Sequence, residues 1–476
     1  MALKNENILP VNSTAQLLKK IVAGVLLLYA TNISAARLEG FEPDYAGRTI
    51  QFVTRIDPVS KTDVAAFALT IGPQGRIQIE TGATDTLFCY ADFDSYRGWM
   101  LLIPGTTTRI SLPPLKVRSF EERKNPYFQP IELWIHAESS APDNLTAAFA
   151  RSERSFYQLS DSFFNQLFVL QQKQFIDTIR IKLSGEHAKN NHPLVSQHHD
   201  LLLANLEADL TRSGREKLMA PFSSLSATAR NSPAFADLLD RIFSNTLSLE
   251  SKTSRGDRIK TMVERRNLAG IRAWSEGYSG THGVLADMVT IKLLHDAFYS
   301  GEFGKNTVLQ MLQQPDLIQH PNLQVRSSAS AVVQKLQFLH TGTLAPKICL
   351  PDLAGNPVCS TAPGKAFQYI LFVDLDIPVG REQLKYLAEI YPSVSERLDL
   401  FVVLTQGERT DNRTFVEEHK IPGTIVIDHE HQSIGKQYKI RSFPSALLLD
   451  RQHRVVLSSA RTPLDGFMQQ FAGLTR

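Results

Sequence analysis

The sequence predicts a multidomain protein in which an N-terminal antiparallel β-sandwich precedes a central α-helical domain and a C-terminal α/β domain. Three observations predict this order. The chain of 476 residues is too long for one ordinary hydrophobic core. Short apolar runs with an alternating pattern fill residues 37–140, and a helical period replaces them in residues 141–340. Strands then alternate with helices from residue 341 to 476, which is typical of a sheet covered by helices.

Residues 1–36 have the pattern of a secretory signal peptide. Lys19 and Lys20 precede an apolar run at 21–30 that is too short to span a bilayer comfortably. Small residues at 34–36 then supply a cleavage point. We therefore expect a mature chain that starts near Arg37 and lies in the periplasm or cell envelope. The alternative is an uncleaved N-terminal anchor helix, which would be the protein's only contact with a membrane.

The sandwich zone and the helical zone differ in their hydrophobic period. Between residues 37 and 140, Gly, Pro and Asp separate short runs in which apolar and polar residues alternate. Between residues 141 and 340, prolines separate longer segments whose apolar residues recur at helical spacing. One predicted buried helix face consists of Val284, Met288, Ile291, Leu294 and Phe298.

Composition and charge limit the partners that the protein can have. A formal net charge of +3, without a basic stripe, gives no electrostatic basis for binding nucleic acid. Two clusters contain metal-ligand residue types, His198-His199-Asp200 and the segment 428–432. Adjacent histidines point to different sides of a helix, and turns are commonly polar, so we expect both clusters to be solvated surface. We predict no metal site and no cofactor.

The C-terminal zone has the element order of an α/β domain. An apolar strand at 368–375 leads into a helix that Pro392 stops. The elements expected after the first strand are a helix at 381–391, a strand at 398–405, a helix at 414–420, a strand at 423–428, a helix at 433–440, a hairpin at 445–459 and a last helix at 463–474.

This order and several fixed residues resemble the TlpA/ResA-type thioredoxin-like domains of the bacterial envelope, which are related to the AhpC/TSA proteins. The matching residues are Ala345-Pro346, Gly355, Gly364-Lys365, Arg381-Glu382 and Ser442-Phe443-Pro444. The resemblance covers residues 341–476 and implies a thioredoxin-like fold. It also implies that Ser442-Phe443-Pro444 forms the family's cis-proline loop, with a cis bond before Pro444.

The sequence departs from the family at its redox site. In the family a Cys-x-x-Cys opens the helix, and the helix dipole lowers the pKa of the first thiol. Alignment on Arg381-Glu382 places Ile377 and Gly380 at the two cysteine positions, with Pro378 and Val379 between them. Neither side chain can attack a disulfide. We expect the neighbouring acids at 374 and 376 to cap the helix or face water, and cysteines at 377 and 380 to restore a reactive dithiol.

The remaining cysteines suggest a structural role. If Gly355 takes the left-handed position of a three-residue turn, Cys349 faces Cys359 across the hairpin, at a separation that suits a disulfide. A two-residue turn would instead send the two sulfurs to opposite faces of the hairpin. We favour a structural disulfide over two free thiols and over a catalytic dithiol. Cys89 stands alone and is expected to be a small buried hydrophobe.

We therefore predict a redox-inactive thioredoxin-like protein that binds a protein or peptide partner and acts in binding or assembly in the cell envelope. This hypothesis makes the protein a binding module and not an enzyme. The alternative is a thiol–disulfide oxidoreductase of the TlpA/ResA type that uses Cys349 and Cys359, or the thiols of a partner.

Overall fold

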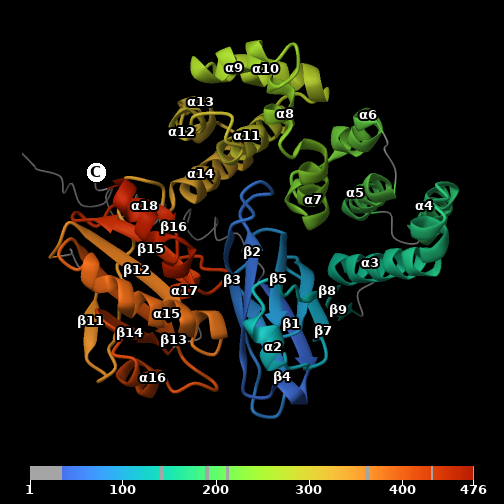
Figure 1. Cartoon of the computed structure of the whole chain (residues 1–476). Helices are drawn as coiled ribbons and strands as arrows, with labels where there is room; N and C mark the ends of the chain where they lie inside the picture. Colours follow the sequence, from blue (N-terminus) through green and yellow to red (C-terminus); the bar gives the residue numbers. More distant parts are fainter. Residues whose placement is uncertain are drawn as a thin grey trace, which may run out of the picture. The chain divides into compact units, whose positions relative to one another are not determined.

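The computed structural model describes residues 35–139, 144–187, 192–210, 214–360, 364–429 and 433–474 (Figure 1). The chain forms two compact units. Unit 1 comprises residues 1–116, 130–242 and 279–281, and unit 2 comprises residues 117–129, 243–278 and 282–476. No helix in the described part of the chain is long and apolar enough to cross a membrane. The predicted signal peptide lies outside the described residues except for Ala35 and Ala36.

The described part of unit 1 contains nine strands. Their bounds are β1 Ala36–Phe41, β2 Thr49–Arg55, β3 Asp63–Thr70, β4 Arg76–Thr81, β5 Leu87–Phe93, β6 Tyr96–Leu102, β7 Thr107–Ser111, β8 Ile131–Trp134 and β9 His136–Glu138. They form two sheets of order β4-β1-β7-β9 and β3-β2-β5-β6-β8. Alternate residues of both sheets, such as Leu38, Phe52 and Met100, share one buried core.

The sandwich differs from the prediction in two strand pairs, because β1 pairs with β7 and β6 pairs with β8 in parallel. Parallel pairs need a long crossover connection instead of a tight turn. The chain provides such connections here, since residues 42–106 separate β1 from β7 and residues 103–130 separate β6 from β8. Turn signals in the sequence report hairpins, and they carry no information about strands that pair across such a distance.

The helices of unit 1 are α3 Leu145–Ser162, the π-helical turn η2 Asn165–Val169, α4 Gln174–His187, α5 Pro193–Leu210, α6 Arg215–Met219 and α7 Pro233–Phe243. His198 and His199 of α5 are 2% and 5% exposed, so the expectation that they are solvated is wrong. The ring of His198 packs against Phe149 at 4.4 Å, and Nε2 of His199 lies against the hydroxyl of Ser152. Neighbouring helices and strands cover α5, which its own sequence does not reveal.

The helices of unit 2 that precede its sheet are α8 Thr246–Ser251, α9 Asp257–Glu264, α10 Leu268–Ser279, α11 Val284–Tyr299, α12 Lys305–Leu312, α13 Pro315–Ile318 and α14 Leu323–Gln337. In the predicted apolar face of α11, Met288, Ile291, Leu294 and Phe298 are buried, and Val284 at its start is half-buried. The helical zone is divided between the units, because α3 to α6 and nearly all of α7 fall in unit 1, and α8 to α14, except Ser279 at the end of α10, fall in unit 2. The three predicted domains thus differ from this grouping in two units.

The C-terminal part of unit 2 is an α/β domain. Its elements are β10 Cys349–Pro351, β11 Pro357–Cys359, β12 Phe367–Val373, α15 Pro378–Ile390, β13 Leu398–Thr405, α16 Asn412–Glu418, β14 Thr424–Asp428, α17 Ser433–Gln437, β15 Ser445–Asp450, β16 Val455–Ala460 and α18 Phe467–Leu474. The main sheet has the order β14-β13-β12-β15-β16. Strands β12, β13 and β14 are parallel, and β15 and β16 run antiparallel to their neighbours.

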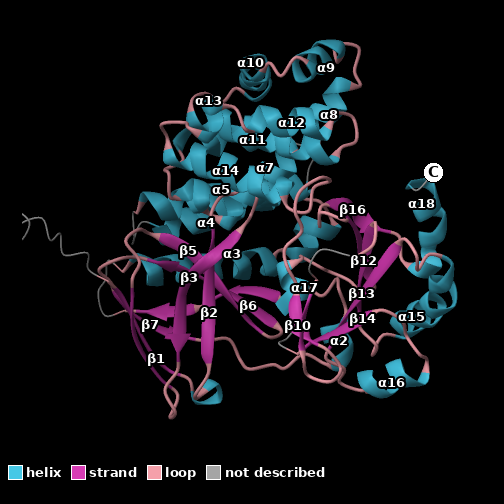
Figure 2. Ribbon diagram, turned by 90° about the vertical axis from the view of Figure 1, so that its left-hand side faces the viewer, coloured by secondary structure: helices cyan, strands magenta, loops and turns pink. Residues whose placement is uncertain are grey.

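Both faces of this sheet are buried, which explains why β12 is apolar throughout. Tyr369, Leu371 and Val373 belong to one core and Ile370 and Phe372 to the other. Helices α15, α16 and α18 cover the first face, and α17 with the β10 hairpin covers the second (Figure 2). The sheet therefore holds the carboxyl end of β12 firmly at the point where α15 begins.

Candidate functional site

The segment Ile377–Gly380, which the sequence aligned with the redox motif of the resembling family, lies at the N-terminus of α15. Ile377 is the N-cap residue and Pro378 is the first helical residue, three residues earlier than predicted. Proline suits this position because the first N–H of a helix has no intrahelical acceptor. The guanidinium of Arg381 donates to the carbonyl of Leu375 at 2.6 Å, which ties the first turn back to the end of β12.

The predicted proline loop lies at the same end of the sheet. Ser445, which directly follows Pro444, pairs with Phe372 near the end of β12. The Phe443–Pro444 peptide bond is cis. Around this end, Pro378, Val379 and Ser442 are exposed, and Phe443 is half-buried. The topology thus brings together two segments that are more than sixty residues apart in the sequence.

Gly380 is buried in the first turn of α15, and the structure explains why a larger residue is disfavoured there. A Cβ atom at this position would lie 2.4 Å from the backbone oxygen of Asp374. Because that neighbour is backbone, it cannot rotate away as a side chain could. A cysteine at 380 would therefore require the backbone of this turn to shift, and the restoration of a reactive dithiol by cysteines at 377 and 380 stays a prediction.

The two acids beside the motif are buried, contrary to the expectation that they cap the helix or face water. The side chains of Asp374 and Asp376 are 1% and 0% exposed. The carboxylate of Asp376 accepts hydrogen bonds from the backbone N–H groups of Glu408, Arg409 and Thr410, at 2.7, 3.0 and 2.9 Å. These three residues follow β13, so Asp376 fixes the loop after β13 to the loop after β12.

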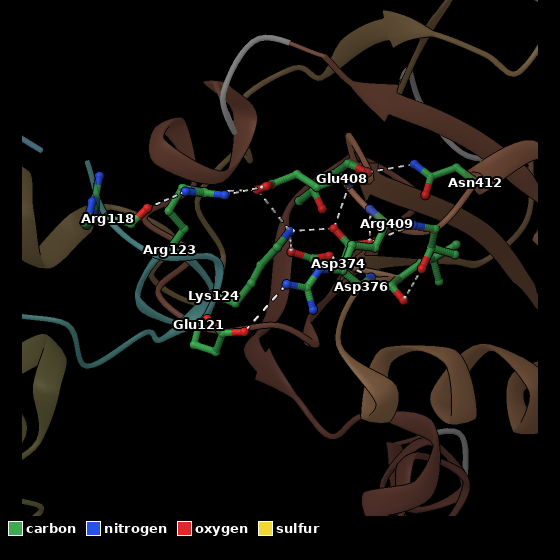
Figure 3. A network of polar contacts seen from close by, with 12 residues as sticks. Arg118, Glu121, Arg123, Lys124, Asp374, Asp376, Glu408, Arg409 and Asn412 are labelled. Atoms are coloured by element: carbon green, nitrogen blue, oxygen red, sulfur yellow. Dashed lines mark hydrogen bonds and ion pairs between the residues drawn. The ribbon is translucent and has the colours of Figure 1, made fainter. Parts of the chain in front are cut away.

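A lysine from a distant part of the sequence neutralises the acid pair (Figure 3). Helix α2, Phe120–Lys124, lies between β7 and β8 in the sequence but belongs to unit 2. The ammonium of Lys124 lies 2.8 Å from Oδ2 of Asp374 and 2.9 Å from Oδ2 of Asp376. The Lys124 side chain is itself 13% exposed. The three charged groups therefore form one buried cluster beside the first turn of α15.

The contacts of this cluster shift the pKa of two of its groups. Burial raises the pKa of Asp376, but the hydrogen bonds from the Glu408 N–H and from Lys124 outweigh it and hold that pKa well below its usual range. Burial lowers the pKa of Lys124, but its hydrogen bonds to Asp374 and Asp376 outweigh this effect and the net shift is upward. Asp376 is thus ionised and Lys124 protonated at neutral pH.

Further contacts hold α2 in place. A capping box between Ser119 and Glu122 closes its N-terminus. Arg123 pairs with Glu408 at 2.7 Å, and the guanidinium of Arg409 lies 3.4 Å from the centre of the Phe120 ring. A helix of five residues is not stable alone, so these contacts decide its position. The sequence shows only a short charged run here, which does not reveal its partners.

The hairpin disulfide is confirmed. Cys349 pairs with Cys359 across β10 and β11, their Cα atoms are 4.1 Å apart, and the two sulfurs are bonded. Gly355 has a φ of +89°, and the N–H of Asp352 donates to the carbonyl of Asn356 at 2.8 Å. The three-residue turn is therefore the one that forms. The hairpin lies beside β14, two strands away from β12, so this sulfur pair is not at the motif.

The other candidate residues have local roles. Oδ2 of Asp428 accepts the N–H of Ile434 at 2.8 Å and so fixes the start of α17. Residues 430–432 of the second cluster lie outside the described residues. Within the described part of the chain, no group of three or more His, Cys, Asp or Glu side chains is placed to hold a metal ion. Cys89 is buried, and burial raises the pKa of its thiol far above the usual range.

The C-terminal domain has a thioredoxin-like fold. A parallel β–α–β unit, β12-α15-β13, lies beside an antiparallel hairpin, β15-β16, and a helix follows each part. The helix that leaves β12 and the proline that precedes β15 meet at one end of the sheet. This topology and site define a thioredoxin-like domain whose first helical turn contains no cysteine.

Among known proteins, the matches to this chain are solved structures. No protein-family model matches the chain, and no curated protein matches it significantly. The thioredoxin domain of a thiol-disulfide oxidoreductase from Bacteroides vulgatus is 22% identical, covering 28% of this chain and 98% of its own, with a TM-score of 0.26. A thiol:disulfide interchange protein from Bacteroides sp. is 23% identical, covering 29% and 93%, with a TM-score of 0.26. StoA from Bacillus subtilis is 17% identical, covering 28% and 97%, with a TM-score of 0.23.

Proposed function

We propose that this protein is an exported, redox-inactive thioredoxin-like protein with a binding or assembly role in the cell envelope. The observation that supports it best is the chemistry of the first turn of α15. Ile377 and Gly380 supply neither a nucleophile nor a resolving thiol. Lys124 lies against both carboxylates beside them, and backbone N–H groups also donate to the carboxylate of Asp376.

The same end of the domain is suited to bind polypeptide. Exposed Pro378 and Val379 lie at the end of the sheet that also carries Ser442 and the half-buried Phe443. Val379 is 45% exposed, although it is apolar. An extended segment that contacts these side chains would bind without any need for sulfur. The partner we propose is therefore a protein or peptide of the envelope.

A disulfide reduction assay tests this function. Purified full-length protein is incubated with insulin and a dithiol reductant, and precipitation of the insulin chains is followed. We expect the rate of the reductant alone, because the described domain has no thiol at the motif. A Cys349→Ser/Cys359→Ser double variant is the matched control, and it should behave like the natural protein.

One observation favours a second candidate. Cys349 is exposed on β10, so the hairpin disulfide is accessible to a reductant. A TlpA/ResA-type oxidoreductase that uses this pair would accelerate the assay, and the double variant would lose the acceleration. That result would replace the redox-inactive proposal.

A further inference from the structure

Unit 1 contains a pocket that the role of the C-terminal domain does not involve. Its volume is about 390 Å³, which is within the usual range for small-ligand sites. Aromatic side chains form much of its wall, among them Trp99, Trp134, Phe156, Tyr157 and Phe168. Phe168 is 40% exposed and lies in the π-helical turn η2, a backbone form that is often found at functional sites.

Two buried polar residues form the inner part of the wall. Glu153 and His198 are 1% and 2% exposed. Nε2 of His198 lies against Oε1 of Glu153. A carboxylate can only accept, so Nε2 of His198 carries a proton, and Nδ1 is an acceptor when the ring is neutral. Oε2 of Glu153 and Nδ1 of His198 have no hydrogen-bond partner among the described residues. Oε2 of Glu153 therefore requires a donor, and Nδ1 of a neutral His198 ring requires a second one.

The outer part of the pocket is acidic. Glu132, Asp161, Asp209 and Asp237 line it, and all four are exposed. Arg241, a base that also lines the pocket, is bonded to Asp209, and Lys61 and Arg97 pair with Asp237 and Glu132. With Glu153, the five carboxylates of the wall still outnumber these three bases. The pocket therefore combines aromatic faces, excess negative charge and unpartnered acceptors. A cation that carries N–H donors and an apolar body satisfies all three features, because ring faces attract cations and acceptors require donors.

We propose that this pocket binds an organic cation, a primary ammonium attached to an apolar or aromatic group. The ammonium is directed to Glu153 and His198, and the apolar body lies between the aromatic side chains. A free amine and a lysine side chain of a polypeptide share this chemistry. An anion or a neutral molecule of the same shape would leave the acceptors without a donor.

Calorimetric titration of the full chain tests the proposal. The probes are phenethylammonium, its neutral analogue phenethyl alcohol, a lysine-containing tetrapeptide with blocked ends, and the same peptide acetylated on the lysine side chain. We expect saturable binding of one ammonium probe per chain, and binding of its neutral counterpart weaker by about tenfold or more. Tighter binding of the lysine peptide would identify a polypeptide ligand, and tighter binding of phenethylammonium would identify a free amine.

Three variants locate the site. Glu153→Gln should weaken ammonium binding by about tenfold. Phe168→Ala should weaken binding severalfold, because this ring lines the pocket. Its melting temperature should not change, because the side chain is exposed. This variant therefore still tests the proposal if Glu153→Gln does not fold. Glu80→Gln is the matched control, because Glu80 is an exposed carboxylate paired with Arg37 on β1, and it should bind like the natural protein. Equal affinity for the alcohol and the ammonium, natural affinity in Phe168→Ala, or no saturable binding of any probe would overturn the proposal.

Discussion

At the scale of single residues, Gly380 lies where the backbone leaves no space for a side chain. A Cβ atom there would lie 2.4 Å from the Asp374 carbonyl oxygen and 3.0 Å from a Val373 methyl group. We predict that Gly380→Ala destabilises the fold by about 1–3 kcal/mol, because overpacking against backbone cannot be relieved by a rotamer change. Urea unfolding followed by circular dichroism measures this difference.

Gly277 provides the matched control for this substitution. It lies inside α10, and nothing lies within 4 Å of a Cβ atom added there. Gly277→Ala should stabilise unit 2 by about 0.5–1 kcal/mol, since alanine loses less backbone entropy in a helix. Equal effects of the two substitutions would show that the first turn of α15 has room for a side chain. In that case the close approach of the Asp374 carbonyl would not exclude a larger residue at 380.

Asp376 makes stability depend on pH. Its folded-state pKa is depressed, chiefly because the Glu408 N–H and Lys124 hydrogen bonds outweigh the effect of burial. The carboxylate therefore contributes stability that is fully present above about pH 4, the usual pKa of an unfolded aspartate. We predict that this contribution falls as the pH drops below that value toward the folded pKa. Urea unfolding over a pH series should show a smaller acid-induced loss in Asp376→Asn than in the natural protein.

At the scale of elements, Lys124 is the residue of α2 that neutralises the buried acid pair of unit 2. Removing the ammonium would leave the buried carboxylates of Asp374 and Asp376 without their counter-charge. We predict that Lys124→Met costs about 3 kcal/mol of unfolding free energy, the lower end of the range for breaking a buried pair. Chemical denaturation of the full chain, followed by a signal from unit 2, measures this change in the free energy of unfolding.

The control for Lys124 is a lysine with an exposed partner. Lys385 on α15 lies 3.1 Å from Glu382, and both side chains are exposed. Lys385→Met should change stability by less than about 1 kcal/mol, because surface ion pairs are hydrated and screened. A loss of the same size in both variants would mean that the buried cluster is not specifically stabilising.

The β10–β11 hairpin gives a prediction about thiols. Of the three cysteines in the chain, two are bonded to each other and Cys89 is buried. We predict that alkylation without reduction labels no cysteine in the folded protein and one cysteine, Cys89, after denaturation. Mass spectrometry of tryptic peptides reads this out. Labelling of Cys349 or Cys359 without a reductant would contradict the bridge in the protein's own compartment.

At the scale of the whole molecule, we expect residues 1–36 to direct export of the protein. Strand β1 begins at Ala36, directly at the predicted cleavage point. We predict that protein from the envelope fraction starts near Arg37, so that the mature chain keeps nearly all of β1. N-terminal sequencing measures this. A chain that still contains the residues before Lys19 would instead support the uncleaved anchor.

Much of the C-terminal domain was predictable from its sequence. The strand and helix order of residues 367–474 follows from periodicity, and the register of the hairpin follows from one glycine that can adopt a positive φ. These signals are local, because hydrogen bonds within a helix or across a tight turn join residues that are close in the chain. The place of Ile377–Gly380 at the start of a helix was predictable for the same reason.

The environment of the site was decided only by the tertiary structure. Lys124 meets Asp374 and Asp376 across 250 residues of sequence, and His198 is buried against Phe149 of another helix. The helical zone is divided between the two units, although the helical spacing of its apolar residues shows no break in the sequence. Local sequence patterns determine which elements form, since their energies depend on near neighbours. Which charges are buried together, and which glycine has no room for a side chain, depends on packing between distant elements, and no local pattern encodes that packing.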